Sequence, residues 1–172
     1  MFAVGDKIVY GGMGVCAVED ITVPDLPGFT RECYVLKPLY QANSKVYAPI
    51  EENPVKMRRL MPQQQAQTLI DGLPRMESLD MGADRQTVHD TCRRVIKSAD
   101  SFMLARLLKT LYNKKRQVAL QKKTMPGAEK EFFDTAERIL FGELAAVLCI
   151  PMEQVEQHIS LRLEDGRAVV AS

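Results

Sequence analysis

Residues 2–21 read FAVGDKIVYGGMGVCAVEDI, and this stretch decides the fold. Two segments of β-branched and small apolar residues flank a turn that contains Gly11, Gly12 and Gly14. Glycine readily adopts the positive φ angles of a tight reversal, so the pattern predicts a strand, a turn and a second strand. An isolated hairpin is only marginally stable in water, and we therefore expect further strands to complete a small β unit.

The chain up to residue 60 supplies three more candidate strands. We predict them at 32–37, 45–50 and 55–60, after a loop rich in turn-forming residues. In the second of these, alternation places Val46 and Ala48 on one face and Lys45 and Tyr47 on the other. Five short strands within about 60 residues predict a small five-stranded Tudor-like or SH3-like β-barrel.

From Met61 onward the hydrophobic period becomes helical. We predict five helices, at 62–70, 85–99, 102–121, 124–149 and 151–163. Asp84 is the expected N-cap of the second helix, either Asp100 or Ser101 that of the third, and Thr124 that of the fourth. Gly166 and the two acids before it are expected to end the last helix. The predicted class is α+β, with a barrel at 1–60, a connecting segment at 61–83 and an all-α domain at 84–172.

A net charge of +1 conceals one strongly cationic segment. Residues 85–123 contain eleven Lys and Arg but only Asp90 and Asp100 as acids, a net charge of +9. A one-sided cationic surface binds duplex DNA by releasing the counterions condensed on the phosphates. A solvated helix surface is the alternative. The candidate DNA contacts are Arg85, His89, Arg93, Arg94, Lys97, Lys114, Lys115 and Arg116.

Two aromatic residues of this segment bear on how it would bind nucleic acid. Phe102 and Tyr112 fall on the apolar side of the predicted third helix, so we expect both in the core. Phosphate contact along a duplex is therefore favoured over stacking on single-stranded bases.

The sequence predicts no catalytic residue, metal site or cofactor. The glycine turn lacks the Lys-Ser/Thr ending of a phosphate loop and joins two strands instead of leading into a helix. Four widely spaced cysteines and two histidines form no zinc motif, and we expect the cysteines in the core as reduced thiols. The carboxylates of the fourth helix are expected on a solvated face; they are Glu129, Glu131, Asp134, Glu137 and Glu143.

A cytoplasmic protein is expected. No apolar run approaches the roughly 20 residues that a membrane helix needs. The first residues after Met1 lack the apolar core of a signal peptide.

Four stretches together resemble the CarD/CdnL family of bacterial transcription regulators. They are VGDKIVYGGMGVCAVEDI at 4–21, ECYVLKPLY at 32–40, KVYAPIEENPVKMRRL at 45–60 and ERILFGELA at 137–145. The resemblance covers nearly the whole chain. Its N-terminal part is also similar to the RNA-polymerase-interacting domain of the transcription-repair coupling factor.

The resemblance implies a transcription regulator that is not an enzyme. Its Tudor-like domain would bind the β subunit of bacterial RNA polymerase, with Lys45, Tyr47 and Pro49 as contacts. Its helical domain would bind promoter DNA at the upstream edge of the transcription bubble and modulate the stability of the open complex. An ungapped match places Arg85 where well-known members have a wedging tryptophan, and Tyr47 where a basic residue is common.

Other interpretations stay open at this stage. A KOW-like module that binds RNA or ribosomes would also use a barrel and basic helices. Tyr47 is equally compatible with simple cross-strand packing. The expected partners are the polymerase β subunit and promoter DNA, with nucleoid association through the polymerase, no membrane and no small-molecule substrate. Activation or repression, and a monomer or a domain-swapped dimer, are not distinguished by the sequence.

Overall fold

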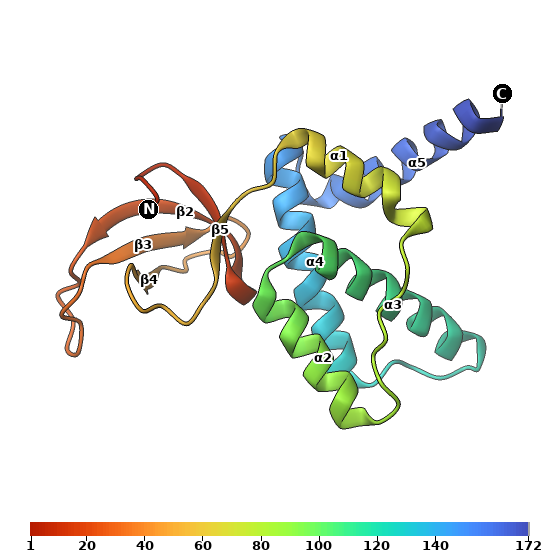
Figure 1. The fold of residues 1–172 in the computed structure, drawn as a ribbon, viewed down its shortest axis with the longest axis horizontal. Helices are drawn as coiled ribbons and strands as arrows, with labels where there is room; N and C mark the ends of the chain where they lie inside the picture. Colours follow the sequence, from red (N-terminus) through yellow and green to blue (C-terminus); the bar gives the residue numbers. More distant parts are fainter. Residues whose placement is uncertain (172) are drawn as a thin grey trace.

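A five-stranded antiparallel sheet and five α-helices lie end to end along the molecule (Figure 1). This computed structural model describes residues 1–171, with side chains described through Leu163. The predicted α+β class is confirmed. The strands are β1 (Lys7–Tyr10), β2 (Gly14–Thr22), β3 (Cys33–Pro38), β4 (Val46–Pro49) and β5 (Met57–Arg59). The α-helices are α1 (Gln63–Gly72), α2 (Arg85–Ser98), α3 (Ser101–Leu120), α4 (Gly127–Leu148) and α5 (Val155–Ala171).

The sheet has the strand order β4-β3-β2-β1-β5, so the last strand returns to pair with the first. The β1–β2 hairpin runs from the pair Lys7–Ala17 to the pair Tyr10–Gly14. A single 3-10 turn, η1 (Gly11–Met13), joins the two strands. The glycines therefore form a hairpin turn, as predicted, and β4 and β5 are the two edges of the sheet.

Side-chain alternation along β1 and β2 gives the sheet two apolar faces. Ile8 and Cys16 point into the barrel, where they pack with Tyr34 and Leu36. Val9 and the residues that share its face point outward into a second core formed with the helices. Because successive side chains of a strand point to opposite sides, one short hairpin supports both cores. The division into 1–60, 61–83 and 84–172 stays a prediction.

Capping residues fix the start of the two basic helices. Asp84 accepts a hydrogen bond from the Thr87 backbone N–H at 2.9 Å and begins α2. Asp100 accepts one from the Met103 backbone N–H at 2.9 Å and begins α3. Thr124 is not an N-cap, because α4 begins later, at Gly127 after Pro126. The predicted end of the last helix is also wrong, since the α5 backbone continues through Gly166 to Ala171.

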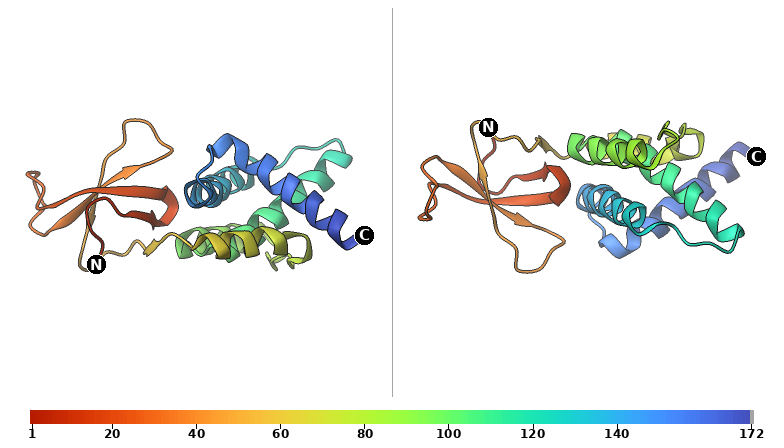
Figure 2. Two further views of the ribbon diagram at one scale, coloured as in Figure 1. Left: turned by 90° about the horizontal axis from the view of Figure 1, so that it is seen from above. Right: turned by 90° about the horizontal axis from the view of Figure 1, so that it is seen from below.

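The β1–β2 turn is where the sheet meets the helices, as both views of Figure 2 show. Arg138 of α4 donates hydrogen bonds to the carbonyls of Met13 and Gly12, both at 3.1 Å. A Cβ at Gly14 would lie 3.4 Å from the Cα of Ile139, so β2 and α4 approach closely there. At Gly142 a Cβ would lie 3.0 Å from the ring of Tyr40. Small residues on both sides thus allow this junction to close.

One ion pair ties the last strand to the helices. Arg58 of β5 donates to both carboxylate oxygens of Glu143 on α4, each at 2.7 Å. The Glu143 side chain is 0% exposed, and its Oε1 also accepts the Met61 backbone N–H at 2.9 Å. Arg58 Nε donates to the carbonyl of Ala99 at 2.7 Å, at the left-handed C-cap of α2. We call Arg58, Glu143 and the Ala99 carbonyl the Arg58 clamp.

Removing Arg58 is expected to destabilise the protein strongly. The Arg58→Ala change leaves the Glu143 carboxylate buried without a counter-ion, which costs about 3–5 kcal/mol of unfolding free energy. Urea denaturation measures this change. The control is Arg59→Ala, whose exposed side chain lies 3.6 Å from Asp6, and we expect a loss below about 1 kcal/mol. Equal losses of unfolding free energy in the two variants would contradict the stabilising role of the Arg58 clamp.

Candidate polymerase-contact and nucleic-acid surfaces

The three residues predicted to contact polymerase lie at strand β4: Tyr47 and Pro49 belong to it, and Lys45 comes two residues before Tyr47, just ahead of the strand. Its partner β3 pairs along one side, from Leu36–Val46 to Cys33–Pro49, and β4 forms the outer edge of the sheet. Val46 and Ala48 pack into the barrel core, as predicted. Lys45 is exposed, and Tyr47 and Pro49 are half-buried. An edge strand presents backbone N–H and C=O groups that a partner strand can use.

Tyr47 has an aromatic neighbour that the sequence did not identify. The Phe29 ring lies edge-on to the Tyr47 ring, with 6.0 Å between the centroids. Phe29 comes from the long β2–β3 loop and is itself exposed, like Leu26 in the same loop. Tyr47 therefore packs within the protein and also belongs to an exposed apolar patch beside β4. The only sequence signal was an isolated phenylalanine in a turn-rich loop.

Helix α2 presents a cationic surface. Arg85, Arg93, Arg94 and Lys97 are all exposed. Arg93 lies 3.4 Å from Asp90, and its guanidinium also stands 5.7 Å from the centroid of the Phe132 ring. In the described part of the chain, the other three make no ion pair within 4.0 Å. We call these four side chains the α2 cations; all four are exposed, and Arg93 alone among them is already paired with an acid of the described residues.

His89 does not share the exposure of the α2 cations. Its ring packs edge-on against Phe132 of α4, with centroids 5.5 Å apart. Its Nε2 atom is buried and has no hydrogen-bond partner within the described residues. His89 is thus half-buried in the α2–α4 contact, where Arg93 of the same helix lies against the same Phe132 ring.

Several cations of α3 are engaged inside the protein. Arg106 donates to the carbonyls of Glu77 and Ser78 at 3.1 and 3.2 Å. Lys109 donates to three carbonyls of the connecting segment, including Met76 at 2.6 Å. These bonds hold the connecting segment, including the 3-10 turn η2 (Leu73–Arg75), against α3. Part of the +9 charge therefore stabilises the fold.

The three predicted contacts near the end of α3 differ in their surroundings. Lys114 forms an ion pair with Glu129 at 2.7 Å. Lys115 lies over the Phe133 ring, 5.5 Å from its centroid. Arg116 is exposed and, among the described residues, has no ion-pair partner within 4.0 Å. Arg116 is thus the most available of the three for an external anion.

Two acids of α4 contradict the expected solvated face. Glu129 is 4% exposed and Glu143 is 0% exposed. Each has a cationic partner on another element, and such partners cannot be seen from the periodicity of α4 alone. Cys149 is exposed, against the expectation of a core position, while the other three cysteines are buried.

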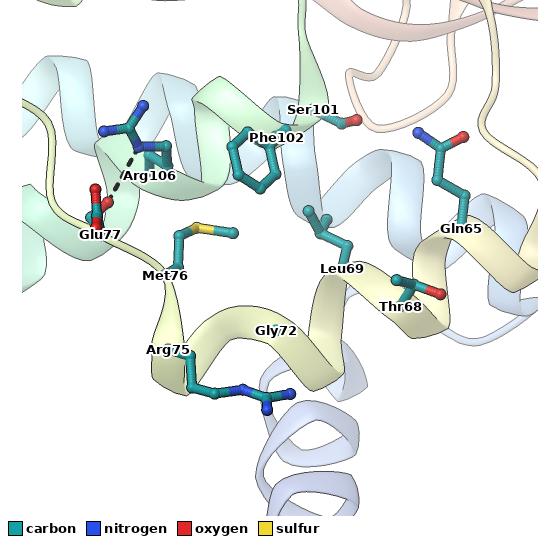
Figure 3. Close-up of a pocket in the computed structure, with 10 residues that line it drawn as sticks. All are labelled: Gln65, Thr68, Leu69, Gly72, Arg75, Met76, Glu77, Ser101, Phe102 and Arg106. Atoms are coloured by element: carbon teal, nitrogen blue, oxygen red, sulfur yellow. Dashed lines mark hydrogen bonds between the residues drawn. The ribbon is translucent and has the colours of Figure 1, made fainter.

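The aromatic residues of α3 also contradict the prediction. Phe102 is 53% exposed and Tyr112 is 52% exposed. Phe102 lies at the edge of a pocket of about 500 Å³ between α1 and α3, beside Leu69 and Met76 (Figure 3). The expectation that both rings are buried is therefore wrong. The argument against stacking on single-stranded bases, which depended on their burial, is lost with it.

No metal or membrane site is visible in the described part of the chain. Within it, no three His, Cys, Asp or Glu side chains are grouped as a metal ion would require. None of its helices combines the length and the apolar character of a membrane span. The pKa of the Cys16 and Cys92 thiols is raised to about 11, mainly by burial, so both stay protonated at neutral pH.

Comparison with known families identifies both halves of the chain. The model of the CarD-like/TRCF RID domain matches residues 2–61. The model of the CarD C-terminal domain matches residues 81–160. The chain is a CarD-like protein. A search of curated proteins gave no match.

Membership of the CarD-like family brings a general function. CarD-like proteins are transcription regulators that interact with RNA polymerase, and their domains are known as non-enzymatic. The Arg58 clamp falls on both family stretches, since Arg58 lies in KVYAPIEENPVKMRRL and Glu143 in ERILFGELA. The residues that support the family resemblance therefore include those that join the sheet to the helices.

The stability of this CarD-like protein should depend on acid pH through the cap of α2. A side-chain hydrogen bond from Thr87, and then its backbone N–H, hold the pKa of Asp84 below its usual value of 3.8. A lowered carboxyl pKa stabilises the fold above the usual value, and this stabilisation is lost as pH falls below it. Urea midpoints between pH 6 and pH 3 should thus fall less in Asp84→Asn than in the wild type.

Asparagine is also a good N-cap, so the Asp84→Asn change isolates the effect of charge from that of capping. Asp90→Asn, on the exposed side of the same helix, is the matched control. A wild-type pH dependence retained in Asp84→Asn and lost in Asp90→Asn would contradict the assignment.

Proposed function

We propose that this CarD-like protein binds the β subunit of RNA polymerase through the edge of β4 and binds promoter DNA through the α2 cations and Arg116. It is not proposed to catalyse a reaction. By holding promoter DNA on the polymerase, it would modulate the stability of the open complex. A change of about 1.4 kcal/mol in that stability alters the equilibrium about tenfold.

The observation that supports the proposal most is the connection between the two surfaces. The Arg58 clamp fixes β5 to the C-terminal end of α2 and to α4. Since β5 belongs to the same sheet as β4, the edge strand and the α2 cations are parts of one packed body. Polymerase bound at β4 would therefore lie at a fixed distance and orientation from DNA bound at the α2 cations.

The exposed patch beside β4 fits a protein partner. The rings of Tyr47 and Phe29 pack together beside the unpaired edge of β4, and the exposed Lys45 directly precedes that strand. Aromatic anchors and main-chain pairing are common features of such interfaces. Pro49 lacks a backbone N–H, so pairing with a partner strand would end near it.

Changing Tyr47 should weaken polymerase binding. Tyr47→Glu places a carboxylate in the apolar patch, where a bound partner would desolvate it, and we expect affinity for the purified β subunit to fall at least about tenfold. Biolayer interferometry measures the effect. Tyr47→Phe should retain binding. Lys56→Glu, next to the opposite edge of the sheet, is the control, and the same loss in that variant would remove the assignment to β4.

Reversing two of the α2 cations should weaken DNA binding and its dependence on salt. In Arg93→Glu/Arg94→Glu, the slope of log K against log salt should become shallower by about 2, since each phosphate contact contributes about 0.9. Fluorescence anisotropy with a labelled promoter duplex measures the slope.

Two outcomes would tell against the DNA assignment. The matched control is Arg31→Glu/Lys56→Glu on the barrel, which changes the net charge equally, and an equal effect there would show a nonspecific charge effect. In nuclease-treated pull-downs, recovery of ribosomal proteins without polymerase would favour an RNA-binding module instead.

A further inference from the structure

Helix α3 is packed into the protein along its first half and extends out of it along its second. Between Ser101 and Leu111 only Phe102 is exposed, whereas seven of the nine residues from Tyr112 to Leu120 are exposed. These last turns lie at the edge of the helical part in Figure 1 and in both views of Figure 2. We call residues 112–120 the α3 tip, which is about 14 Å long at the rise of an α-helix.

The exposure of the α3 tip on several sides distinguishes it from α2. Helix α2 buries side chains along its length, from Val88 to Val95, and packs against α4. A helix with its side chains is about 10–12 Å wide, and the major groove of B-DNA is about 12 Å wide. A helix enters that groove only where its flanks are also uncovered. The α3 tip meets this condition, whereas α2 presents one face from which its cations can reach phosphates.

The end of α3 has an excess of positive charge. Residues 101–128 contain seven Lys and Arg and no Asp or Glu. Two acids of α4 act on this end of α3, since Glu129 pairs with Lys114 and Lys115 lowers the pKa of Glu137, although burial raises that pKa more.

Three cations near the tip are left over after this pairing. Arg116, Lys122 and Lys123 are exposed and, among the described residues, form no ion pair within 4.0 Å. A cationic surface of this kind is complementary to a polyanion such as the DNA backbone.

The outer face of the α3 tip has side chains that can read bases. Asn113, Arg116, Gln117 and Leu120 follow one another at i, i+3, i+4 and i+7, so they share a face, and all four are exposed. In the major groove, Asn and Gln bind the edge of adenine, Arg binds guanine, and an apolar side chain contacts the methyl group of thymine. A helix lying on a lipid surface needs several large apolar residues on one face, and this face has one, Leu120.

We propose that the α3 tip enters the major groove of promoter DNA. Arg116 and Gln117 contact base edges there, Leu120 contacts a thymine methyl group, and Lys122 and Lys123 bind the phosphates beside the groove. This role rests on the proposed function, because the partner is the same DNA. It adds a preference for sequence, which the contacts of the α2 cations with phosphates cannot supply.

Two duplexes test the proposal on the full chain. One is a fluorescein-labelled promoter duplex of about 20 base pairs. The other has the same sequence with glucosylated 5-hydroxymethylcytosine in place of cytosine, so that glucose fills the major groove while the phosphates and the minor groove are unchanged. In fluorescence anisotropy the unmodified duplex should bind at least about tenfold more tightly.

Variants without a change of charge locate the base contacts. Gln117→Ala/Leu120→Ala should bind the unmodified duplex several-fold less tightly and the glucosylated duplex as the wild type does, with the same salt dependence. The matched control is Gln63→Ala/Gln64→Ala in the first turn of α1, two exposed residues whose replacement should leave both affinities unchanged.

A second pair of substitutions tests the phosphate contacts. In Lys122→Gln/Lys123→Gln the slope of log K against log salt should become shallower by about 2, because each phosphate contact contributes about 0.9. Circular dichroism checks that these exposed substitutions leave the helices intact.

Four results would overturn the proposal. Equal binding of the two duplexes by the wild type, with both weakened in Arg93→Glu/Arg94→Glu, would remove the α3 tip from the groove and leave the proposed function standing. Unchanged affinities in Gln117→Ala/Leu120→Ala would remove the base contacts. The absence of binding to either duplex would overturn the proposed function as well. Binding of phosphatidylserine vesicles, lost in Lys122→Gln/Lys123→Gln and without binding of duplex, would assign the tip to a lipid surface.

Discussion

In this CarD-like protein, the position of the sheet against the helices depends on the hydrogen bonds made by one guanidinium group. Arg58 donates to both oxygens of Glu143 and to the carbonyl that ends α2. A buried carboxylate is costly unless it is paired and hydrogen-bonded, and here both conditions are met. The cation also lies at the C-terminal end of α2, where the helix dipole favours positive charge. Sheet, linker and two helices thus share one electrostatic contact.

Packing around this contact explains the small residues of the junction. Arg138 closes on the carbonyls of the hairpin turn, and Gly142 leaves room for the Tyr40 ring. Because Arg138, Gly142 and Glu143 lie close together on α4, one helix supplies the surface on which the barrel rests. Val9 then contributes to the same core as the helices. The stretch ERILFGELA at 137–145 has the pattern of an ordinary amphipathic helix, but much of it forms the surface that contacts the sheet.

Local patterns in the sequence were enough to predict the strands, the hairpin turn and the caps of α2 and α3. These features depend on residues within a few positions of one another. Glu129 and Glu143 were misread as surface charges because their partners lie 15 and 85 positions away. The prediction that Tyr112 is buried failed for a related reason, since the exposure of a residue on α3 depends on how the neighbouring helices pack against it. In the candidate site, the α2 cations are exposed as expected. The contact between Phe29 and Tyr47 could not be predicted, because it depends on how the β2–β3 loop folds back toward β4.

The position of Arg58 in the chain has a consequence during synthesis. A chain leaves the ribosome from its N-terminus, and domains generally form in that order. The five strands are complete at Arg59, but Glu143 follows Arg58 by 85 residues. Until α4 emerges, the nascent barrel exposes Val9 and an unpaired cation on the face that the helices later cover. The helices thus complete their core against residues of the barrel. A helical fragment made without the barrel would retain Glu143 with no counter-ion.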